Sequence, residues 1–344
     1  MIEIDGSVGE GGGQVIRTAI ALSALTGKDF KINNIRKGRP NPGLQAQHLA
    51  AVDAMANICN ADVNGNTLNS IELEFHPGKM RFGGIDVSVS TAGSVGLILQ
   101  PILIAASGIK DNLFVKINGG ATNGKWAPPV HFMREVLLNH LEKMNYKSSI
   151  RVDKYGYYPK GGAVTEVVIQ PSVLDPIIIE AQGKITDVYG ISHASSHLED
   201  KKVAERQARR AKEIIEKNLG IKASIGVEYY NTLNPGSGIE LFAKTESTIL
   251  GADGLGEIKK SAEDVGEEAA NNLLQQIKNG GTVDEYSEDQ LLPFMALATE
   301  RGDSSIKVGK MTSHTRTNIF VIEKFLPVKF HTEGKIVKCS KLNK

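Results

Sequence analysis

The sequence of 344 residues has few cysteines, few aromatic residues and almost no net charge. Its two cysteines, Cys59 and Cys339, cannot build a disulfide framework, and their spacing matches no metal cluster. The 40 basic and 39 acidic residues give a formal charge of +1. This balance argues against a protein that coats nucleic acid by bulk electrostatics, but it is compatible with a local basic pocket for one end of a polynucleotide.

Long apolar runs are also missing. Residues 95–106, VGLILQPILIAA, form the longest one, but Gln100 and Pro101 interrupt it and it is too short to span a bilayer. The start, MIEIDGSVGE, lacks the basic residues and apolar core of a signal peptide. The sequence therefore predicts a soluble, cytoplasmic protein without membrane association, and it leaves the oligomeric state open.

What the sequence does contain is one order of elements repeated three times. Residues 1–80 read β-α-β-α-β-β by hydrophobic period and Gly/Pro punctuation, and residues 85–170 repeat that order. Residues 288–339 follow it again from the first helix onward. Residue identity between the units is low, so the repeat rests on the pattern of elements.

Residues 183–280 break this order. They predict a βαββα block that has a long charged helix over 200–220 and its own amphipathic elements. The predicted fold class is therefore α/β (α+β). A large catalytic domain of three βαβαββ-type repeats occupies residues 1–182 and 281–344, and a small α/β domain is inserted at 183–280.

The repeat has a consequence for function, because equivalent loops of a pseudo-threefold arrangement tend to converge. The loops that contain Arg39, Pro128 and His314 occupy matching positions in the three units. So do three helix starts, GEGGGQ, TAGSVG and YSEDQ. We expect these segments to face a common cleft.

The first helix start, GSVGEGGGQVIR at residues 6–17, is rich in glycine. Glycines before a helix let backbone N–H groups approach a phosphate. The spacing matches neither a P-loop nor a dinucleotide fingerprint, so a tight strand-to-helix turn is the alternative. Glu10 could hold Mg²⁺ beside a phosphate, or it could be a first-turn charge that the helix dipole favours.

Other polar residues also admit two interpretations. The loop with Arg39 could bind phosphate or be a solvated basic loop, and Gln47 follows it on a helix. Gln100 lies in an apolar helix and needs a partner, either within the core or on a ligand. Tyr286 could stack on a ligand, and helix capping alone could explain Asp289.

Two further patterns favour structural explanations. HASSH places His193 and His197 four residues apart, but without a third ligand metal binding is the lesser alternative. KKVAERQARRAK has acidic neighbours, which favours a solvated helix face over a nucleic-acid patch.

Six motifs occur in order along the chain, namely EGGGQVIRTA, RKGRPNPGLQAQHL, STAGSVGLILQ, YYPKGGA, EYSEDQLLPFMALA and SHTRTNIFVIEKFLPV. Together they closely resemble the RNA 3′-terminal phosphate cyclases, in a version that looks archaeal, over essentially the whole chain. The fold of that family, three βαβαββ-type units with a small inserted domain, agrees with the division above.

The resemblance implies an ATP-dependent, ligase-type nucleotidyl transfer in RNA processing. Such enzymes convert an RNA 3′-phosphate into a 2′,3′-cyclic phosphate and release AMP and pyrophosphate. The nucleophilic histidine of the family falls on His314, which would form a covalent histidine–AMP. The RNA 3′-phosphate then takes the adenylate, and the 2′-hydroxyl displaces AMP. A neutral imidazole suits this role because it is nucleophilic near pH 7.

The resemblance also implies roles for other residues. Pro128 and Tyr286 would enclose the adenine, Glu10 matches the position of a divalent metal, Mg²⁺ or Mn²⁺, and three residues fall where phosphates of ATP or RNA are handled. The positions that match ATP binding are Gln100, Pro128, Tyr286, Ser287, Glu288, Asp289 and Gln290, and the phosphate positions are Arg17, Arg39 and Gln47.

The sequence departs from the family pattern at two positions. Ala163 replaces a usual glycine, and Arg316 stands at a commonly apolar position, where we expect it to lower the pKa of His314. The main alternative is a catalytically inactive, cyclase-like factor that binds or processes RNA, and a second is an enolpyruvyl transferase with the same repeating unit. His314 together with residues 286–290 argues against both.

Overall fold

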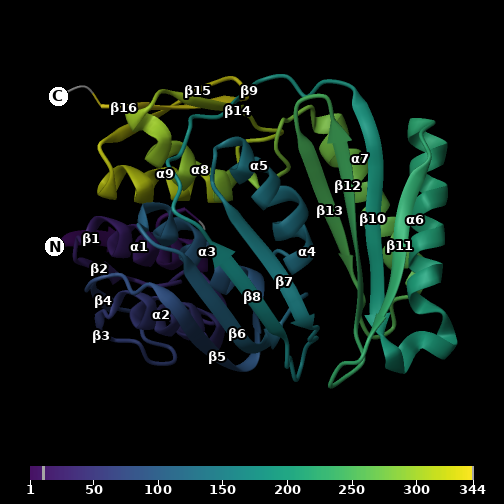
Figure 1. The fold of residues 1–344 in the computed structure, drawn as a ribbon, viewed down its shortest axis with the longest axis horizontal. Coiled ribbons are helices and arrows are strands. Elements are labelled where there is room, and N and C mark those ends of the chain that lie inside the picture. Colours follow the sequence, from purple (N-terminus) through teal and green to yellow (C-terminus); the bar gives the residue numbers. More distant parts are fainter. Residues whose placement is uncertain (10–11, 343–344) are drawn as a thin grey trace.

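The computed structural model describes residues 1–9 and 12–342. Figure 1 shows three sheets with their helices on the left and a fourth sheet, covered by two helices, on the right. The N-terminus and the C-terminal end both lie on the left. No helix among the described residues combines the length and the apolar character needed to cross a membrane.

Three of the four sheets have the same topology. In each sheet the strands follow the order first, second, fourth and third, with the first pair parallel and the other pairs antiparallel. This confirms the predicted α/β fold with three repeated units. In this spatial order the strands are β1 (Ile2–Asp5), β2 (Phe30–Asn33), β4 (Leu73–His76) and β3 (Asp62–Asn64); β5 (Gly83–Ser94), β6 (Leu113–Ala121), β8 (Val164–Ile169) and β7 (Ser148–Lys154); β9 (Ile178–Ile179), β14 (Ser304–Lys307), β16 (Ile336–Lys341) and β15 (Val328–Glu333).

The helices of the three units pack against one another and form the main core. They are α1 (Gly13–Thr26), α2 (Ala46–Cys59), α3 (Val95–Ala105), α4 (Val130–Phe132), α5 (Leu138–Lys143), α8 (Glu288–Leu297) and α9 (Ser313–Phe325). A π-helical turn, Met133–Leu137, joins α4 to α5 into one helical segment, 130–143. Helix α1 is central because it contacts α2, α3 and α9.

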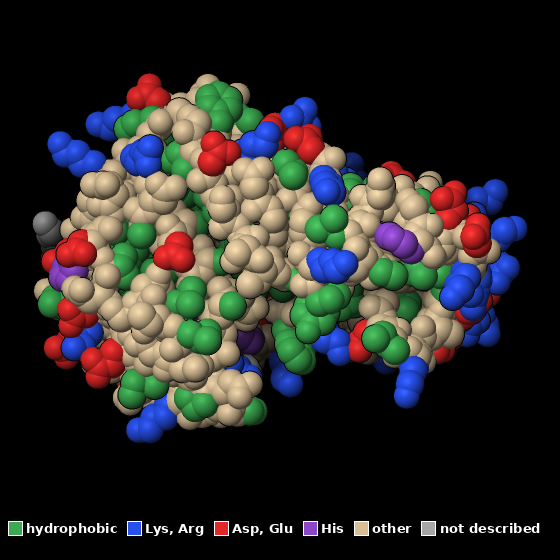
Figure 2. Space-filling view, turned by 90° about the horizontal axis from the view of Figure 1, so that it is seen from below, with side chains coloured by type: hydrophobic (Ala, Val, Ile, Leu, Met, Phe, Trp, Pro, Cys, Tyr) green, Lys and Arg blue, Asp and Glu red, His purple; other side chains and the backbone are tan. Residues whose placement is uncertain are grey.

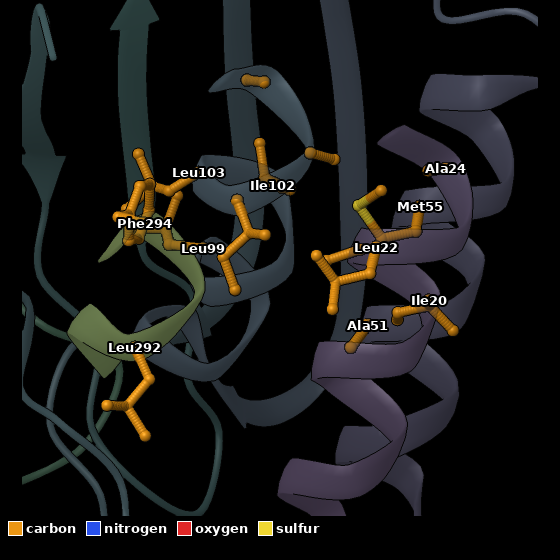
Figure 3. Packing of buried hydrophobic residues seen from close by; sticks show 14 of the residues in the cluster. Ile20, Leu22, Ala24, Ala51, Met55, Leu99, Ile102, Leu103, Leu292 and Phe294 are labelled. Carbon is orange, nitrogen blue, oxygen red and sulfur yellow. The ribbon is translucent and has the colours of Figure 1, made fainter. Parts of the chain in front are cut away.

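Helix α1 packs its apolar side chains against two neighbouring helices. In Figure 3, Ile20 and Leu22 of α1 lie beside Met55 of α2, and Leu99 of α3 continues the layer toward Phe294 of α8. These side chains are almost completely removed from solvent. Burial on this scale, at about 25 cal/mol per Å² of apolar surface, stabilises the packing of the helices against one another.

The fourth sheet lies between β9 and α8 in the chain. Its strands, in spatial order, are β11 (Ala223–Tyr230), β10 (Ile185–Ser195), β12 (Ser237–Thr245) and β13 (Ile249–Leu255), and it packs on α6 (Val203–Leu219) and α7 (Ala262–Asn279). The sequence prediction for this block omitted β13. The division into domains at 1–182, 183–280 and 281–344 stays a prediction.

The charged helix α6 pairs with α7. The Arg206 guanidinium donates to both carboxylate oxygens of Glu263, at 2.8 and 2.6 Å, and Arg210 Nε donates to Glu267 at 2.9 Å. Figure 2 shows basic and acidic side chains mixed over the end of the molecule that α6 covers. KKVAERQARRAK therefore forms a solvated, ion-paired helix face, as the sequence predicted.

A small apolar cluster joins the fourth sheet to helical segment 130–143. Phe132 and Val136 pack there against Phe242 and Ile249. Gly251 of β13 leaves the room that they need, because a Cβ atom on it would lie 2.6 Å from Phe132 Cε2 and 2.8 Å from Val136 Cγ2.

We predict that Gly251→Ala destabilises the protein by about 1 to 3 kcal/mol, because the added methyl group overpacks this contact. Gly84→Ala is the matched control, since a Cβ atom there meets nothing within 4 Å. Chemical denaturation of both variants measures the effect. Equal stability of the two variants would contradict the packing argument.

A second prediction concerns acid stability. Burial, helped by Lys143, lowers the pKa of His140 from 6.5 to about 3. The unfolded chain therefore binds a proton at His140 that the folded chain excludes. The contribution of His140 to the free energy of unfolding is constant above about pH 6.5 and becomes destabilising as the pH falls below this value. The free energy of unfolding of His140→Gln, compared with that of the wild type, should rise by about 2 to 3 kcal/mol when the pH is lowered from neutral to about 4.5. His197→Gln, at an exposed site, should show no such gain in denaturation curves at the two pH values.

Candidate active site

Three helix starts converge at the side-chain amide of Gln14. Gln14 lies in the first turn of α1, and its side chain is almost fully buried. Its Oε1 lies 2.5 Å from Nδ1 of His314 in the first turn of α9, and its Nε2 donates to Oδ2 of Asp289 in the first turn of α8. One amide therefore connects the first and third repeated units.

This connection defines the tautomer of His314. In its ionised form the Asp289 carboxylate only accepts hydrogen bonds, so it takes the amide N–H of Gln14 and turns the amide oxygen toward the imidazole. His314 Nδ1 must then donate its proton to Gln14 Oε1. The lone pair of a neutral ring is consequently on Nε2, and the side chain is exposed.

Arg17 extends the cluster to the second repeated unit. Its Nε donates to Oε1 of Gln100 in α3 at 2.8 Å, so Gln100 has a side-chain partner next to the helix starts. Burial lowers the pKa of Arg17 to about 10, although the nearby Asp289 carboxylate opposes this shift. Burial also raises the pKa of Asp289 to about 7, against the effect of Arg17.

These side chains surround a small cavity. Gln14, Arg17, Gln100, Asp289 and Gln290 line it together with Asn318 of α9, and its volume is about 20 Å³. A cavity of this size has room for no more than about one water molecule. A nucleotide would therefore bind outside it, on the side where His314 is exposed.

The glycine turn before α1 is lined by basic groups. A Cβ atom on Gly12 would lie 3.7 Å both from Nη2 of Arg39 and from Cε1 of His314. A Cβ atom on Gly13 would lie 2.2 Å from His48 Nε2, so only glycine fits there. The N-terminus of α1, Arg39 and the exposed imidazole thus share one place, which suits an anion such as phosphate.

His48 is held in its neutral form at this turn. Burial, together with Arg17 and Arg36, lowers its pKa to about 3. The backbone N–H of Gln45 donates to His48 Nδ1 at 3.0 Å, which leaves the ring proton on Nε2 facing Gly13. His48 can therefore donate one hydrogen bond to an anion at the turn.

Two acidic residues at the start of α8 and just before it hold the neighbouring loops in place. The Glu288 carboxylate accepts hydrogen bonds from the Thr315 hydroxyl and the Thr312 backbone N–H, and burial raises its pKa. Asp284 accepts from the backbone N–H of Ser287 at 2.8 Å, and Ser287 is itself buried. Both carboxylates therefore bind backbone N–H groups at helix starts, and the predicted role of Glu288 in ATP binding stays a prediction.

The residues predicted to enclose the adenine lie nearby. The Tyr286 ring is 40% exposed and contacts Phe132 edge to face, with 6.0 Å between ring centroids. Pro128 packs its carbonyl oxygen against Gly96 at the start of α3. Gln290 donates to the Tyr286 carbonyl oxygen at 2.6 Å, and its own Oε1 is buried without a hydrogen-bond partner.

Gln47, a predicted phosphate-binding residue, is not joined to this cluster. Gln47 is exposed on the first turn of α2, next to the buried His48. Glu10, the predicted metal ligand, lies outside the described residues. Arg316 is exposed on α9, and its predicted effect on the pKa of His314 stays a prediction.

Gln14 and Asn318 are functional residues for which the sequence predicted no role. Asn318 accepts from the Thr18 hydroxyl at 2.6 Å and donates to the Asp289 carbonyl oxygen at 2.6 Å. Both are polar residues in otherwise apolar helices, and a buried polar side chain needs a hydrogen-bond partner, so this pattern could have indicated them.

Comparison with known proteins gives a consistent family. The family model described as RNA 3′-terminal phosphate cyclase matches residues 8–332. The protein named RNA 3′-terminal phosphate cyclase from Methanopyrus kandleri is 44% identical over 342 residues, which cover 97% of this chain and 96% of that protein. Those with the same name from Pyrococcus abyssi and Methanococcoides burtonii are each 43% identical over 343 residues, covering 99% of this chain and 98% and 99% of the relatives. The chain belongs to the RNA 3′-terminal phosphate cyclase family.

Proposed function

We propose that this protein converts an RNA 3′-terminal phosphate into a 2′,3′-cyclic phosphodiester, with ATP as co-substrate and a covalent adenylate on His314. Family membership supports the general activity. The observation that carries the mechanism is the 2.5 Å contact between His314 Nδ1 and Gln14 Oε1, because a neutral ring that donates from Nδ1 has its nucleophilic lone pair on Nε2.

In the first step Nε2 attacks the α-phosphorus of ATP, a P–N bond forms and pyrophosphate leaves. The imidazole becomes positively charged as the bond forms, while Nδ1 keeps its proton. Gln14 accepts that proton's hydrogen bond and is itself polarised by the Asp289 carboxylate. The arrangement is fixed before reaction and stabilises the charge where it develops.

The phosphates would lie at the glycine turn before α1. Arg39 approaches this turn beside His314, Arg17 approaches it one residue further on, and neutral His48 offers its Nε2 proton. The guanidinium group of arginine and the backbone N–H groups of a helix N-terminus both donate hydrogen bonds to phosphate oxygens. Tyr286 and Pro128 are proposed to hold the adenine, and Gln290 Oε1 could accept from its amino group.

In the second step an oxygen of the RNA 3′-phosphate attacks the adenylate phosphorus, and the bond to His314 breaks. In the third step the vicinal 2′-hydroxyl oxygen attacks the 3′-phosphorus, AMP leaves, and the hydroxyl proton passes to solvent. Each transfer breaks one bond to phosphorus as another forms, so one set of phosphate contacts can serve all three.

A divalent cation, Mg²⁺ or Mn²⁺, would supply charge neutralisation at the triphosphate when bound. The donor chemistry near the helix starts fits such an ion, because carboxylate oxygens are the ligands it prefers and Glu288 Oε2 is buried without a hydrogen-bond partner. Glu10 is the proposed ligand.

The proposal predicts an adduct on one residue. Wild-type protein supplied with metal and with ATP labelled at the α-phosphate should form an acid-labile, alkali-stable adduct, because a phosphoramidate behaves in this way. His314→Ala should reduce both this adduct and RNA cyclisation by roughly a thousandfold or more, since the nucleophile is lost. His331→Ala, at an exposed histidine of β15, is the control and should behave as wild type. Absence of an adduct from wild-type protein would favour the alternative, an inactive RNA-processing or RNA-binding factor.

A further prediction concerns Gln14. Replacing it with leucine keeps the size of the side chain but removes the acceptor that fixes the tautomer of His314. We expect the single-turnover rate of adenylation at saturating ATP to fall about a hundredfold, with little change in ATP affinity. Gln170→Leu, at an exposed position, should leave the rate unchanged. An unchanged rate in a folded Gln14→Leu variant would remove Gln14 from the mechanism.

A further inference from the structure

A second buried polar cluster lies where the fourth sheet meets helical segment 130–143. It contains His131 from α4, His193 from β10 and Glu240 from β12, and all three side chains are at most 2% exposed. One nitrogen or oxygen atom from each residue lies within 4.8 Å of the other two. The helix starts at Gln14 do not use this cluster.

The nitrogen and oxygen atoms of the cluster lie at hydrogen-bond distances, which are close to the spacing of metal ligands. Glu240 Oε2 lies 3.1 Å from His131 Nδ1 and 3.1 Å from His193 Nε2. Ligands of a tetrahedral ion with bonds of about 2.0 to 2.2 Å lie about 3.3 Å apart. Only a small movement of each side chain would admit an ion between these atoms.

The remaining nitrogen of each imidazole already has a partner. His131 Nε2 lies 2.8 Å from the Tyr155 hydroxyl, and His193 Nδ1 lies 2.6 Å from the Tyr157 hydroxyl. Histidines that bind metals are held in this way, because a hydrogen bond to the second nitrogen fixes the ring orientation. Without an ion, the nitrogens that face the Glu240 carboxylate carry the protons, and metal binding would release them.

The carboxylate is oriented as well. Asn123 Nδ2 donates to Glu240 Oε1 at 2.5 Å. Both histidines contact Oε2 at 3.1 Å, and His193 Nε2 also lies 3.3 Å from Oε1. Tyr155 stacks on Tyr230 with 3.5 Å between ring centroids, so aromatic rings cover the side of the cluster next to His131.

We propose that His131, His193 and Glu240 form a binding site for a transition-metal ion, with Zn²⁺ as the best match. Two imidazoles and one carboxylate form a ligand set that zinc sites use, with a solvent oxygen in the fourth position. The set differs from the oxygen ligands that suit the Mg²⁺ or Mn²⁺ of nucleotide transfer.

The site would act as a structural connection between the inserted block and the repeats. Its ligands come from two strands of the fourth sheet and from α4, and the next residue of α4, Phe132, contacts Tyr286. A metal ion held there would fix the position of α4 relative to β10 and β12. This inference does not depend on the proposed function, because the site is separate from the reacting groups.

His193 therefore differs from its neighbour in HASSH. His197 is exposed, and its Nδ1 lies 2.8 Å from the Ser195 hydroxyl of the same turn. The partners of His193 come from positions 131 and 240, far away in sequence. His197 is consequently a matched control for any test of the site.

The test is a measurement of metal content and affinity on the full chain. Protein stripped with chelator is titrated with Zn²⁺ in the presence of excess Mg²⁺, which keeps oxygen-ligand sites filled. We expect about one Zn²⁺ per chain and a rise in the thermal midpoint. Co²⁺ in its place should give the visible absorption of a tetrahedral nitrogen–oxygen site. His131→Ala and Glu240→Gln should abolish the stoichiometric binding, and His197→Ala should retain it.

Absence of Zn²⁺ binding by the wild-type protein would overturn the proposal, and the cluster would then be a hydrogen-bonded network only. Full binding by folded His131→Ala would also overturn it, since the ion would be elsewhere. If these variants do not fold, Tyr157→Phe gives a milder test, because it removes only the hydrogen bond to His193. We expect it to weaken Zn²⁺ binding about tenfold, and unchanged affinity would count against the site.

Discussion

The side-chain amide of Gln14 is the contact on which the candidate site depends. An amide has one accepting and one donating end, so the carboxylate of Asp289 on one side determines what His314 meets on the other. The three residues come from the first turns of three helices, and none of these helices could orient the imidazole alone. The repeated architecture therefore matters chemically, because it brings helix starts from distant parts of the chain to one point.

The meeting of these helix starts also brings together two charged side chains, Arg17 and Asp289, whose charged forms are disfavoured by burial. Arg17 and Asp289 are each shifted toward the neutral form by burial, and each opposes the shift of the other. Their hydrogen bonds to Gln100 and Gln14 satisfy the groups that solvent would otherwise bind. Such a site has little freedom to rearrange, and fixed dipoles in a partly dry environment are what phosphoryl-transfer chemistry requires.

Much of the fold was predictable because the repeated helices and strands have clear periods and glycine or proline boundaries. Strand β9 has only two residues and therefore no period, and β13 contains Gly251, Asp253 and Gly254, residue types that strands disfavour. Only the tertiary contact explains Gly251. In the site, the family resemblance indicated His314, Arg17 and Gln100, whereas Gln14 lies 300 positions from His314 and no local pattern reports such a contact. His131 and Glu240, the partners of His193, could not be predicted either, because they are also distant from it in the sequence.

The third repeated unit is divided in a way that orders its assembly. Its first strand, β9, pairs in parallel with β14, with Ile178 opposite Ser305, so the whole fourth sheet is synthesised between two neighbouring strands. The first two units can fold during synthesis. The third sheet, which contains β9 and β14, can form only after the C-terminal strands have been synthesised. His314 lies in this C-terminal stretch, whereas Gln14, whose amide contacts it, lies near the N-terminus. A chain truncated before this stretch would therefore lack both the last strands of the third sheet and the residue proposed as the nucleophile.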